Sequence, residues 1–309
     1  MALAQQMTQG ATGYAFERWN VFTKDPKGGN PLVVFLDGEG LSDVQMQKFG
    51  HDIDLSEVIF LLPKQSKPGT VKARIFNRTS EMVFAGHPIL GAATAVWTGM
   101  PAGKRKPVMD VVLDVPIGPI PVTMTREGAT VYGEMLQTDP VFAEKHEAEK
   151  VAAILGIPAG GIVRDYPIQN VSTGRPNLIV LVDSMKTAAA IKIDGAAMRE
   201  YFAGGDAQRS FYILSRETVD KSAQMHARKP SAIAANEDPA TGSAAGPAIA
   251  WMVRYGLVKS GQKIAIEQGI EVHRPGRIMA SAVLTGEKVA GVRVGGYSVR
   301  VAAGSMNPT

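Results

Sequence analysis

Hydrophobic residues in the first half of the chain come in short runs separated by glycine, proline and polar residues. Short apolar runs with this punctuation are typical of β-strands. The first two runs flank Lys27-Gly28-Gly29-Asn30-Pro31, a strong turn signal, and are expected to form a β-hairpin. We expect strands at residues 14–22, 32–36, 58–62, 71–76, 110–113, 120–125 and 130–135.

Two helices are predicted among these strands. Ser42 is a suitable cap for a short helix that continues through Phe49. The second helix covers residues 88–97, is rich in alanine and glycine, and ends at Gly99. Its apolar residues recur at helical spacing, so one face is expected to be buried.

The second half of the chain repeats this plan. A helix at residues 148–155 is expected to end at Gly156, because glycine terminates helices readily. A second helix rich in alanine and glycine is expected from about Ser243 to Tyr255, with Pro247 in its first turn. It follows a loop at residues 236–242. Further strands are expected at residues 177–182, 211–215, 263–267, 277–284 and 289–301.

These elements predict an α+β fold of two similar domains, each a curved, mostly antiparallel sheet around a central apolar helix. A chain of 309 residues is long for one core and comfortable for two. We place the domains at residues 1–127 and 128–309, and the alternative that the last strand returns to the first domain stays open. A cleft between two such domains is a preferred place for a small-molecule site.

Composition removes several classes of chemistry. The chain has no cysteine, which excludes disulfides, thiolate metal sites and thiol nucleophiles. Its five histidines have no metal-like spacing, so no metal site is expected. The sequence also contains neither a phosphate-binding loop nor a dinucleotide fingerprint.

Charge and hydropathy limit the classes of partner and the cellular location that are expected. The net charge of +4 is dispersed, and the densest basic cluster, Lys104-Arg105-Lys106, has no interleaved aromatic residues, so nucleic acid is not an expected partner. No apolar run approaches the ~20 residues of a membrane span. Residues 1–12 lack the basic flank and apolar block of a secretory signal, so the cytoplasm is the default location.

The first candidate for catalysis is Glu57, which stands at the mouth of the apolar strand at residues 58–62. Burial disfavours the charged form of a carboxyl group, so this position is expected to raise the pKa of Glu57 toward that of a useful general base. The alternative is a glutamate at the strand edge that points to solvent.

The second candidate is His87, in the segment Phe84-Ala85-Gly86-His87-Pro88. Pro88 suits the start of a helix, so His87 is expected beside backbone N–H groups that attract an anion. A helix N-terminus disfavours a protonated imidazole, which predicts a neutral histidine that forms hydrogen bonds. A capping or core histidine is the alternative.

The third candidate is the segment from Glu237 to Pro247, which contains Asp238 and the start of the second apolar helix. Its glycines and alanines allow a ligand to approach the backbone N–H groups of the helix start. Asp238 is expected to point into the same region. The alternative is that Asp238 or Thr241 simply caps the helix.

Together these segments resemble the PhzF-like family of phenazine biosynthesis. Four segments carry the resemblance, occur in the order found in the family and span most of the chain. They are Gly29-Asn30-Pro31, Leu55-Ser56-Glu57, the segment from Glu81 to Pro88 and the segment from Glu237 to Ala244. The last two are long enough to be specific.

The resemblance implies a diaminopimelate-epimerase-like fold, a homodimer and no cofactor. In the namesake enzyme a glutamate transfers a proton along an allylic system of dihydro-hydroxyanthranilate, while a histidine and an aspartate hold the substrate. The matching catalytic positions here are Glu57, His87 and Asp238. The expected substrate-binding residues lie beside them in the matching segments: Ser56, Gly86, Thr241, Gly242 and Ser243.

Two positions depart from the pattern of the family. Val83 stands where proline is frequent, and Asp54 precedes Leu55 where asparagine is common. Neither change removes a catalytic group, but Asp54 adds a charge near Glu57. The related epimerases of this fold use two cysteines, and this chain has none.

The expected function is therefore that of a cofactor-free isomerase or epimerase that shifts a proton on a small carboxylated amino or hydroxy acid. A non-catalytic homologue that binds a small molecule in the same cleft is the alternative, and the complete set of Glu57, His87 and Asp238 argues against it. A serine hydrolase using Ser243 lacks the Gly-x-Ser-x-Gly elbow and a basic partner. The substrate cannot be inferred from the fold.

Overall fold

The computed structural model describes residues 13–203, 210–232 and 237–308. The chain divides after Leu136 and again before Gly295 into two compact units. Unit 1 combines the N-terminal part with the last residues of the chain, and unit 2 comprises residues 137–294. Residues 1–12, considered above for a secretory signal, and Asn236, the first residue of the expected loop, lie outside the described residues.

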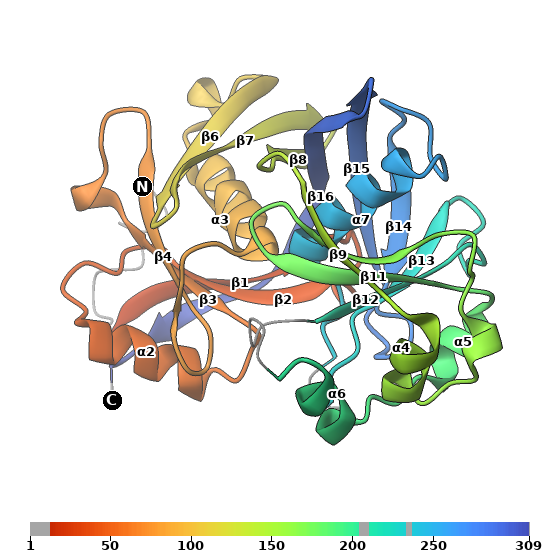
Figure 1. Cartoon of the computed structure of the whole chain (residues 1–309). Helices are drawn as coiled ribbons and strands as arrows, with labels where there is room; N and C mark the ends of the chain where they lie inside the picture. Colours follow the sequence, from red (N-terminus) through yellow and green to blue (C-terminus); the bar gives the residue numbers. More distant parts are fainter. Residues whose placement is uncertain (1–12, 204–209, 233–236, 309) are drawn as a thin grey trace. The chain divides into compact units, whose positions relative to one another are not determined.

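The described part of unit 1 contains a mixed sheet and two α-helices (Figure 1). In chain order its elements are β1 (Tyr14–Val21), β2 (Asn30–Phe35), α2 (Asp43–Asp52), β3 (Val58–Leu62), the 3₁₀ turn η1 (Pro63–Gln65), β4 (Val71–Phe76), β5 (Glu81–Met82), α3 (Gly86–Gly99), η2 (Ala102–Lys104), β6 (Val108–Val115), β7 (Gly118–Glu127) and β8 (Thr130–Leu136). The strand order is β1-β2-β3-β4-β6-β7-β8. Only the β2–β3 and β4–β6 pairs along this order are parallel, so the sheet is mostly antiparallel.

Several local expectations for unit 1 are confirmed. β1 and β2 form the antiparallel hairpin, with Val21 opposite Asn30. Ser42 caps α2 and forms a capping box with Gln45, which satisfies backbone N–H groups at both positions.

The domain boundary lies elsewhere than expected. The boundary expected after residue 127 falls in the turn of the β7–β8 hairpin, whereas the chain divides after Leu136.

The apolar helix α3 lies at the centre of one hydrophobic core of unit 1, and a second buried cluster includes Met46 and Phe49 of α2. α3 packs against β1, β2, β3, β6, β7 and β8, and most of its residues are buried. A Cβ on Gly91 would lie 2.5 Å from Cδ2 of Leu32, so glycine allows the helix and β2 to approach closely. The sheet of unit 1 therefore curves around one central helix, as expected from the sequence.

Unit 2 follows the same plan. Its elements are β9 (Val141–His146), α4 (Ala148–Leu155), η3 (Ala159–Gly161), β10 (Ile168–Ser172), β11 (Pro176–Val182), α5 (Met185–Ala190), α6 (Gly195–Tyr201), β12 (Phe211–Ser215), β13 (Met225–Arg228), α7 (Gly242–Arg254), β14 (Ile264–Gln268), β15 (Gly276–Thr285) and the first part of β16 (Lys288–Met306). The strand order is β15-β14-β13-β12-β11-β10-β9, with parallel pairing between β11 and β12 and between β13 and β14. The last part of β16 belongs to unit 1, where residues 298–306 pair with β1.

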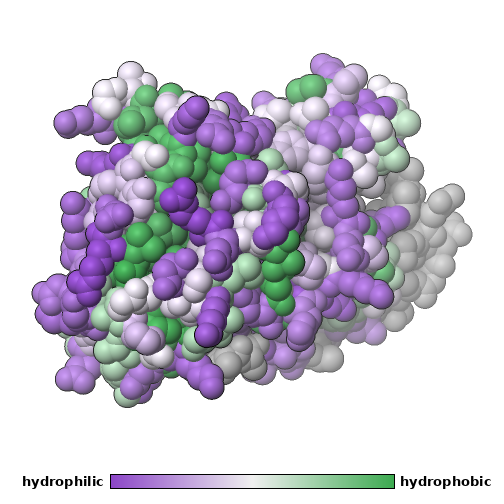
Figure 2. All heavy atoms as spheres, turned by 90° about the vertical axis from the view of Figure 1, so that its right-hand side faces the viewer, coloured by the Kyte–Doolittle hydropathy of each residue, from purple (hydrophilic) through white to green (hydrophobic). Residues whose placement is uncertain are grey.

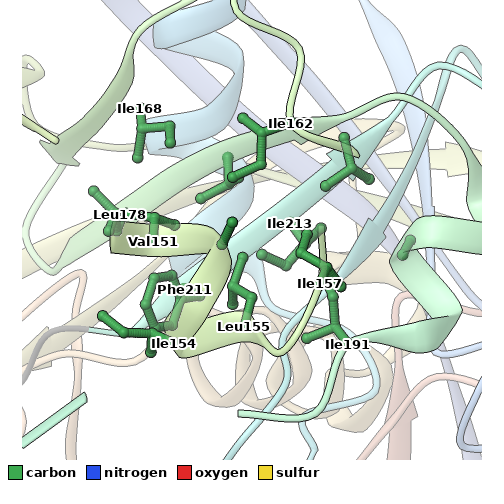
Figure 3. Packing of buried hydrophobic residues seen from close by; sticks show 14 residues of the cluster. Val151, Ile154, Leu155, Ile157, Ile162, Ile168, Leu178, Ile191, Phe211 and Ile213 are labelled. Atoms are coloured by element: carbon green, nitrogen blue, oxygen red, sulfur yellow. The ribbon is translucent and has the colours of Figure 1, made fainter. Parts of the chain in front are cut away.

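One hydrophobic core of unit 2 lies where α4 packs on the sheet (Figure 3). Val151 and Leu155 of α4, Leu178 of β11, and Phe211 and Ile213 of β12 all belong to this buried cluster. α4 ends as expected at Gly156, which adopts the left-handed conformation that glycine permits.

The second apolar helix, α7, is buried along most of its length and packs against β10, β11 and β15. It begins at Gly242, so Pro247 lies in the second turn, and the expectation of a first-turn proline was wrong. Proline has no N–H to donate to the carbonyl four residues earlier, which is that of Ser243. The Nδ2 of Asn177 donates to this carbonyl instead, at 3.2 Å, which compensates for the missing bond.

Besides the short 3₁₀ turns, four strands and two α-helices were not anticipated: β5, β9, β10, β13, α5 and α6. β9 is an edge strand with mostly exposed residues, and β13 carries His226 and Arg228 within four buried positions. Neither strand has the apolar run by which a strand is recognised in a sequence. The residues of β9 are mostly exposed, and two of the buried positions of β13 hold charged or polar side chains in ion pairs.

Three further observations concern the surface, the helices and the side chains that could bind a metal. Hydrophilic side chains are spread over the face shown in Figure 2, with hydrophobic patches between them. None of the described helices is long and apolar enough to cross a membrane. Among residues 13–203, 210–232 and 237–308, no group of three or more histidine or acidic side chains could hold a metal ion.

Candidate active site

His87 is the second residue of α3 and is buried, with 5% of its side chain exposed. Asn30, the first residue of β2, lies with Nδ2 at 3.2 Å from Nδ1 of His87. With the amide in this orientation Nδ2 donates, so Nδ1 accepts and the proton of the neutral imidazole is on Nε2. The first residue of β2 thus holds one ring nitrogen of the histidine.

The other ring nitrogen of His87 points toward a carboxylate. Its Nε2 has no hydrogen-bond partner among the described residues and lies 3.7 Å from Oε2 of Glu57. Burial lowers the pKa of His87 to about 3. The imidazole is therefore neutral near pH 7, as expected from the sequence, although burial is the cause here. A neutral Nε2–H can donate a hydrogen bond to a bound molecule.

Glu57 directly precedes the wholly buried strand β3, and 13% of its side chain is exposed. It is thus a mostly buried carboxylate and not a glutamate that points to solvent. Ser56 beside it is exposed. Asp54, which differs from the pattern of the family, is 70% exposed and forms an ion pair with Arg78, so its charge has its own partner.

The start of α3 has no side-chain cap. The N-cap residue is Ala85 in an extended conformation, and Pro88 in the first turn carries no N–H. Gly86, the first residue of the helix, is buried. The backbone N–H groups of Gly86 and His87 are thus not capped by an N-cap side chain, which is the arrangement that binds anions at helix starts.

In unit 2, Asp238 lies four residues before Gly242, the first residue of α7, and its carboxylate is held by Thr241. The Thr241 hydroxyl donates to Oδ2 of Asp238 at 2.7 Å. Thr241 is the N-cap residue of α7, but its side chain does not cap the helix. The alternative of Thr241 as a simple cap is therefore wrong, and its hydroxyl serves Asp238 instead.

Gly242 and Ser243 are the first two residues of α7, and neighbouring amide side chains hold their carbonyl groups. Nε2 of Gln137 donates to the Gly242 carbonyl at 3.0 Å, while the Thr173 hydroxyl donates to Oε1 of Gln137 at 2.6 Å. Asn177 donates to the Ser243 carbonyl. Side chains of Gln137 and Asn177, which lie outside α7, thus hold the first turn of the helix by hydrogen bonds.

Sequence reasoning missed several polar residues around Asp238. Lys229 lies with Nζ at 2.5 Å from Oδ1 of Asn177 and from the Ser210 hydroxyl. Burial and the charge of Arg175 lower the pKa of Lys229 to about 7, partly offset by Asp238. Lys229 directly follows β13, and a lysine at the end of a buried strand could have indicated a site residue. The sequence offered little reason to select it, because β13 itself was not expected.

A second missed group is a buried network of charged residues. Arg228 binds Glu237, the neighbour of Asp238, through Nε and Nη2 at 3.0 and 2.6 Å. His226 lies between Glu267 and Glu271, each 3.0 Å from one ring nitrogen. Burial opposes a charge on His226, but the hydrogen bonds and charges of Glu271 and Glu267 outweigh it and raise the pKa.

The structure thus brings the candidates together in two groups, each within one unit. Glu57, His87 and Gly86 form the group of unit 1, and Asp238, Thr241, Gly242 and Ser243 form the group of unit 2. The first group offers a carboxylate beside a neutral imidazole, which suits proton transfer. The second offers a carboxylate held by a hydroxyl, beside a helix start.

Residues 19–304 match the family model of the PhzC-PhzF phenazine biosynthesis-like proteins. The chain belongs to this family. It is 32% identical to an uncharacterized isomerase of Mesorhizobium japonicum, over 93% of this chain and 97% of the relative. It is 31% identical to the trans-2,3-dihydro-3-hydroxyanthranilate isomerase of Pseudomonas aeruginosa, over 92% of this chain and 96% of that enzyme.

The fold agrees with this family. A solved PhzF-family structure from Bacillus anthracis matches with a TM-score of 0.83 and 25% sequence identity, and the match covers 96% of this chain and 99% of that chain. The expected α+β fold of the diaminopimelate-epimerase-like type is thereby confirmed. The protein is an isomerase of the PhzF family.

Proposed function

We propose that this PhzF-family isomerase shifts a proton on a small carboxylated amino or hydroxy acid without a cofactor, with Glu57 as the acid/base group. One observation carries the proposal: Nε2 of the neutral His87 has no hydrogen-bond partner among the described residues and lies 3.7 Å from Glu57. A buried polar group without a partner is costly, and a bound substrate would supply the missing acceptor.

The roles proposed for the other residues are those of the matching positions in the family. His87 and Asp238 hold polar groups of the substrate, the former as a donor and the latter as an acceptor. The uncapped helix starts at Gly86 and at Gly242 and Ser243 suit a substrate carboxylate. Ser56, next to Glu57, and Thr241, next to Gly242, complete the proposed set of binding residues. The proposed active form of the enzyme is a homodimer.

The first substrate to test is trans-2,3-dihydro-3-hydroxyanthranilate, because relatives of this chain from three Pseudomonas species are named as isomerases of that compound. Identity near 30% over the whole chain supports a shared reaction type more strongly than a shared substrate. Amino and hydroxy acids of similar size therefore belong in the same screen.

The experiment is an exchange screen in heavy water, in which NMR detects deuterium that the enzyme introduces into each candidate. The proposal predicts enzyme-dependent incorporation for at least one carboxylated compound. Glu57→Gln preserves the shape of the side chain but removes the base, so exchange should fall by about a hundredfold or more.

The matched control is Asp54→Asn. It removes a carboxylate three residues away, where Arg78 already pairs the charge, and asparagine tolerates the positive φ of 60° at this position. Exchange should stay near the wild-type rate. Normal exchange in Glu57→Gln, together with its loss in Asp238→Asn, would instead make Asp238 the base.

The screen, combined with two further assays, separates the two alternatives. A non-catalytic binding protein would bind a compound in equilibrium dialysis and show no exchange with any candidate. A serine hydrolase would lose activity when Ser243 reacts with a phosphonate, whereas the proposed isomerase would continue to exchange protons.

A further inference from the structure

Gln268, the last residue of β14, is fully buried and makes four hydrogen bonds around Asp238. Its Nε2 donates to the Asp238 carbonyl at 2.7 Å and to the Thr241 hydroxyl oxygen at 3.0 Å. Its Oε1 accepts from the backbone N–H of Thr241 and from the Tyr212 hydroxyl, both at 3.0 Å. Every donor and acceptor of this amide is therefore used.

The orientation of the Gln268 amide is dictated by the backbone. The Asp238 carbonyl can only accept and the Thr241 N–H can only donate, so a flipped amide would place like groups against both. Nε2 must therefore face the Thr241 hydroxyl. Since that oxygen accepts from Gln268, its single proton is left for Oδ2 of Asp238, 2.7 Å away.

We propose that Gln268 is a positioning residue: it aims the Thr241 hydroxyl proton at Asp238 and so holds this carboxylate charged and ready to accept a hydrogen bond. A hydrogen bond to the charged form of an acid favours that form. The role in catalysis rests on the proposed function of Asp238, whereas the effect on the charge of Asp238 does not.

The decisive substitution is Gln268→Glu, which keeps the size of the side chain but replaces the donor Nε2 by an acceptor. The introduced carboxylate competes for the proton of the Thr241 hydroxyl, and Asp238 loses the hydrogen bond from Thr241. We expect the pH midpoint for protonation of Asp238 to rise by on the order of one unit, since a hydrogen bond to a charged group is lost. Carboxyl ¹³C NMR measures this in the protein alone, with Asp238→Asn identifying the signal.

Gln268→Glu can act on Asp238 in two ways, through its added charge and through the loss of the hydrogen bond from Thr241. A double-mutant cycle with Thr241→Val, in which the hydroxyl is absent, distinguishes the two effects. If Gln268 acts through Thr241, the two shifts together are smaller than their sum, whereas a purely electrostatic effect gives additive shifts. Lys229 and Tyr212, two titratable groups that interact electrostatically with Asp238, are present in all four proteins. Additive shifts, or no shift in either single variant, would overturn the proposal.

Gln169 provides the matched control in the same unit. It is also buried, donates from Nε2 to the Ala143 carbonyl and accepts from the Tyr255 hydroxyl, but has no bond to Asp238 or Thr241. Gln169→Glu should leave the midpoint of Asp238 unchanged. If the carboxylate at position 268 prevents folding, Gln268→Met removes the donor without adding a charge and should raise the midpoint by a smaller amount, and no rise would contradict the proposal.

A second readout concerns turnover of whichever compound the heavy-water screen identifies. Gln268→Glu should lower kcat more than it raises KM, because it disturbs an interaction that must be correctly oriented in the transition state. Gln169→Glu should change neither. An absence of any substrate would contradict the proposed function but leave the NMR test of Gln268 intact.

Discussion

At the scale of single residues, the buried imidazole of His87 makes the stability of unit 1 depend on pH. Burial lowers the pKa of His87 to about 3, whereas an exposed histidine titrates near 6.5. Between these pH values the unfolded chain binds a proton that the folded chain does not, so stability falls as the pH falls. We expect a loss of ~2 kcal/mol between pH 6.5 and pH 5.

Urea unfolding of the wild type and of His87→Gln at both pH values measures this loss. The variant lacks the titrating group, so the difference between the two proteins should shrink or reverse as the pH falls. A difference that stays constant with pH would contradict the neutral, buried state of His87.

Some residues of the candidate site could be predicted from the sequence, and others could not. Glu57 and His87 stand at the ends of strongly apolar segments, and the structure places them 3.7 Å apart. Gln268 was not anticipated, because its partners at positions 212, 238 and 241 come together only in the folded unit. A glutamine at the end of an apolar strand carries no local sign of such contacts.

At the scale of elements, the close packing of α3 rests on Gly91. A Cβ there would lie 2.5 Å from Leu32 and 2.9 Å from Val21, and both neighbours are fully buried. Gly91→Ala should therefore destabilise the protein by about 1–3 kcal/mol, the usual cost of overpacking. Gly99→Ala in the same helix is the control, because nothing lies within 4 Å of its Cβ position.

Thermal and urea unfolding of both variants provide the comparison. Equal stabilities of Gly91→Ala and Gly99→Ala would show that β2 can move away from α3 at little cost. Gly99 has no positive φ, so its replacement should change stability by less than the replacement of Gly91 does.

The elements also show where hydrophobic patterning is sufficient. Strands with apolar runs, such as β3 and β11, and the alternating strand β4 were expected within one residue of their bounds. β13 was missed because His226 and Arg228 occupy buried positions, where ion pairs with glutamates stabilise them. The second-turn position of Pro247 depends on Asn177, 66 residues from the Ser243 carbonyl that it binds, and no local pattern contains that information.

At the scale of the whole molecule, the plan of one apolar helix inside each sheet is visible in the sequence as two helices rich in alanine and glycine. Their repetition predicted two similar halves. The exact division was harder to predict, because the last part of β16 pairs with β1 at the other end of the chain. Pairing between strands that lie nearly 300 residues apart is not encoded in local periodicity.

The two units should respond to pH in opposite directions. In unit 2, hydrogen bonds with Glu271 and Glu267 raise the pKa of His226 despite the opposing effect of burial. A raised pKa contributes stability that is fully present below the unfolded value near 6.5 and is lost as the pH rises through the folded value. In unit 1 the lowered pKa of His87 has the reverse effect, with stability lost as the pH falls below 6.5.

Hydrogen exchange followed by mass spectrometry resolves the two units in one protein, once rates are corrected for the intrinsic effect of pH. Peptides from α3 should lose protection between pH 6.5 and pH 5, and His87→Gln should remove this dependence. Peptides from β13 and β14 should lose protection between pH 6.5 and pH 9, and His226→Gln should remove that dependence instead. If both units changed in the same direction, or if each variant altered both, the two histidines would not control stability within their own units.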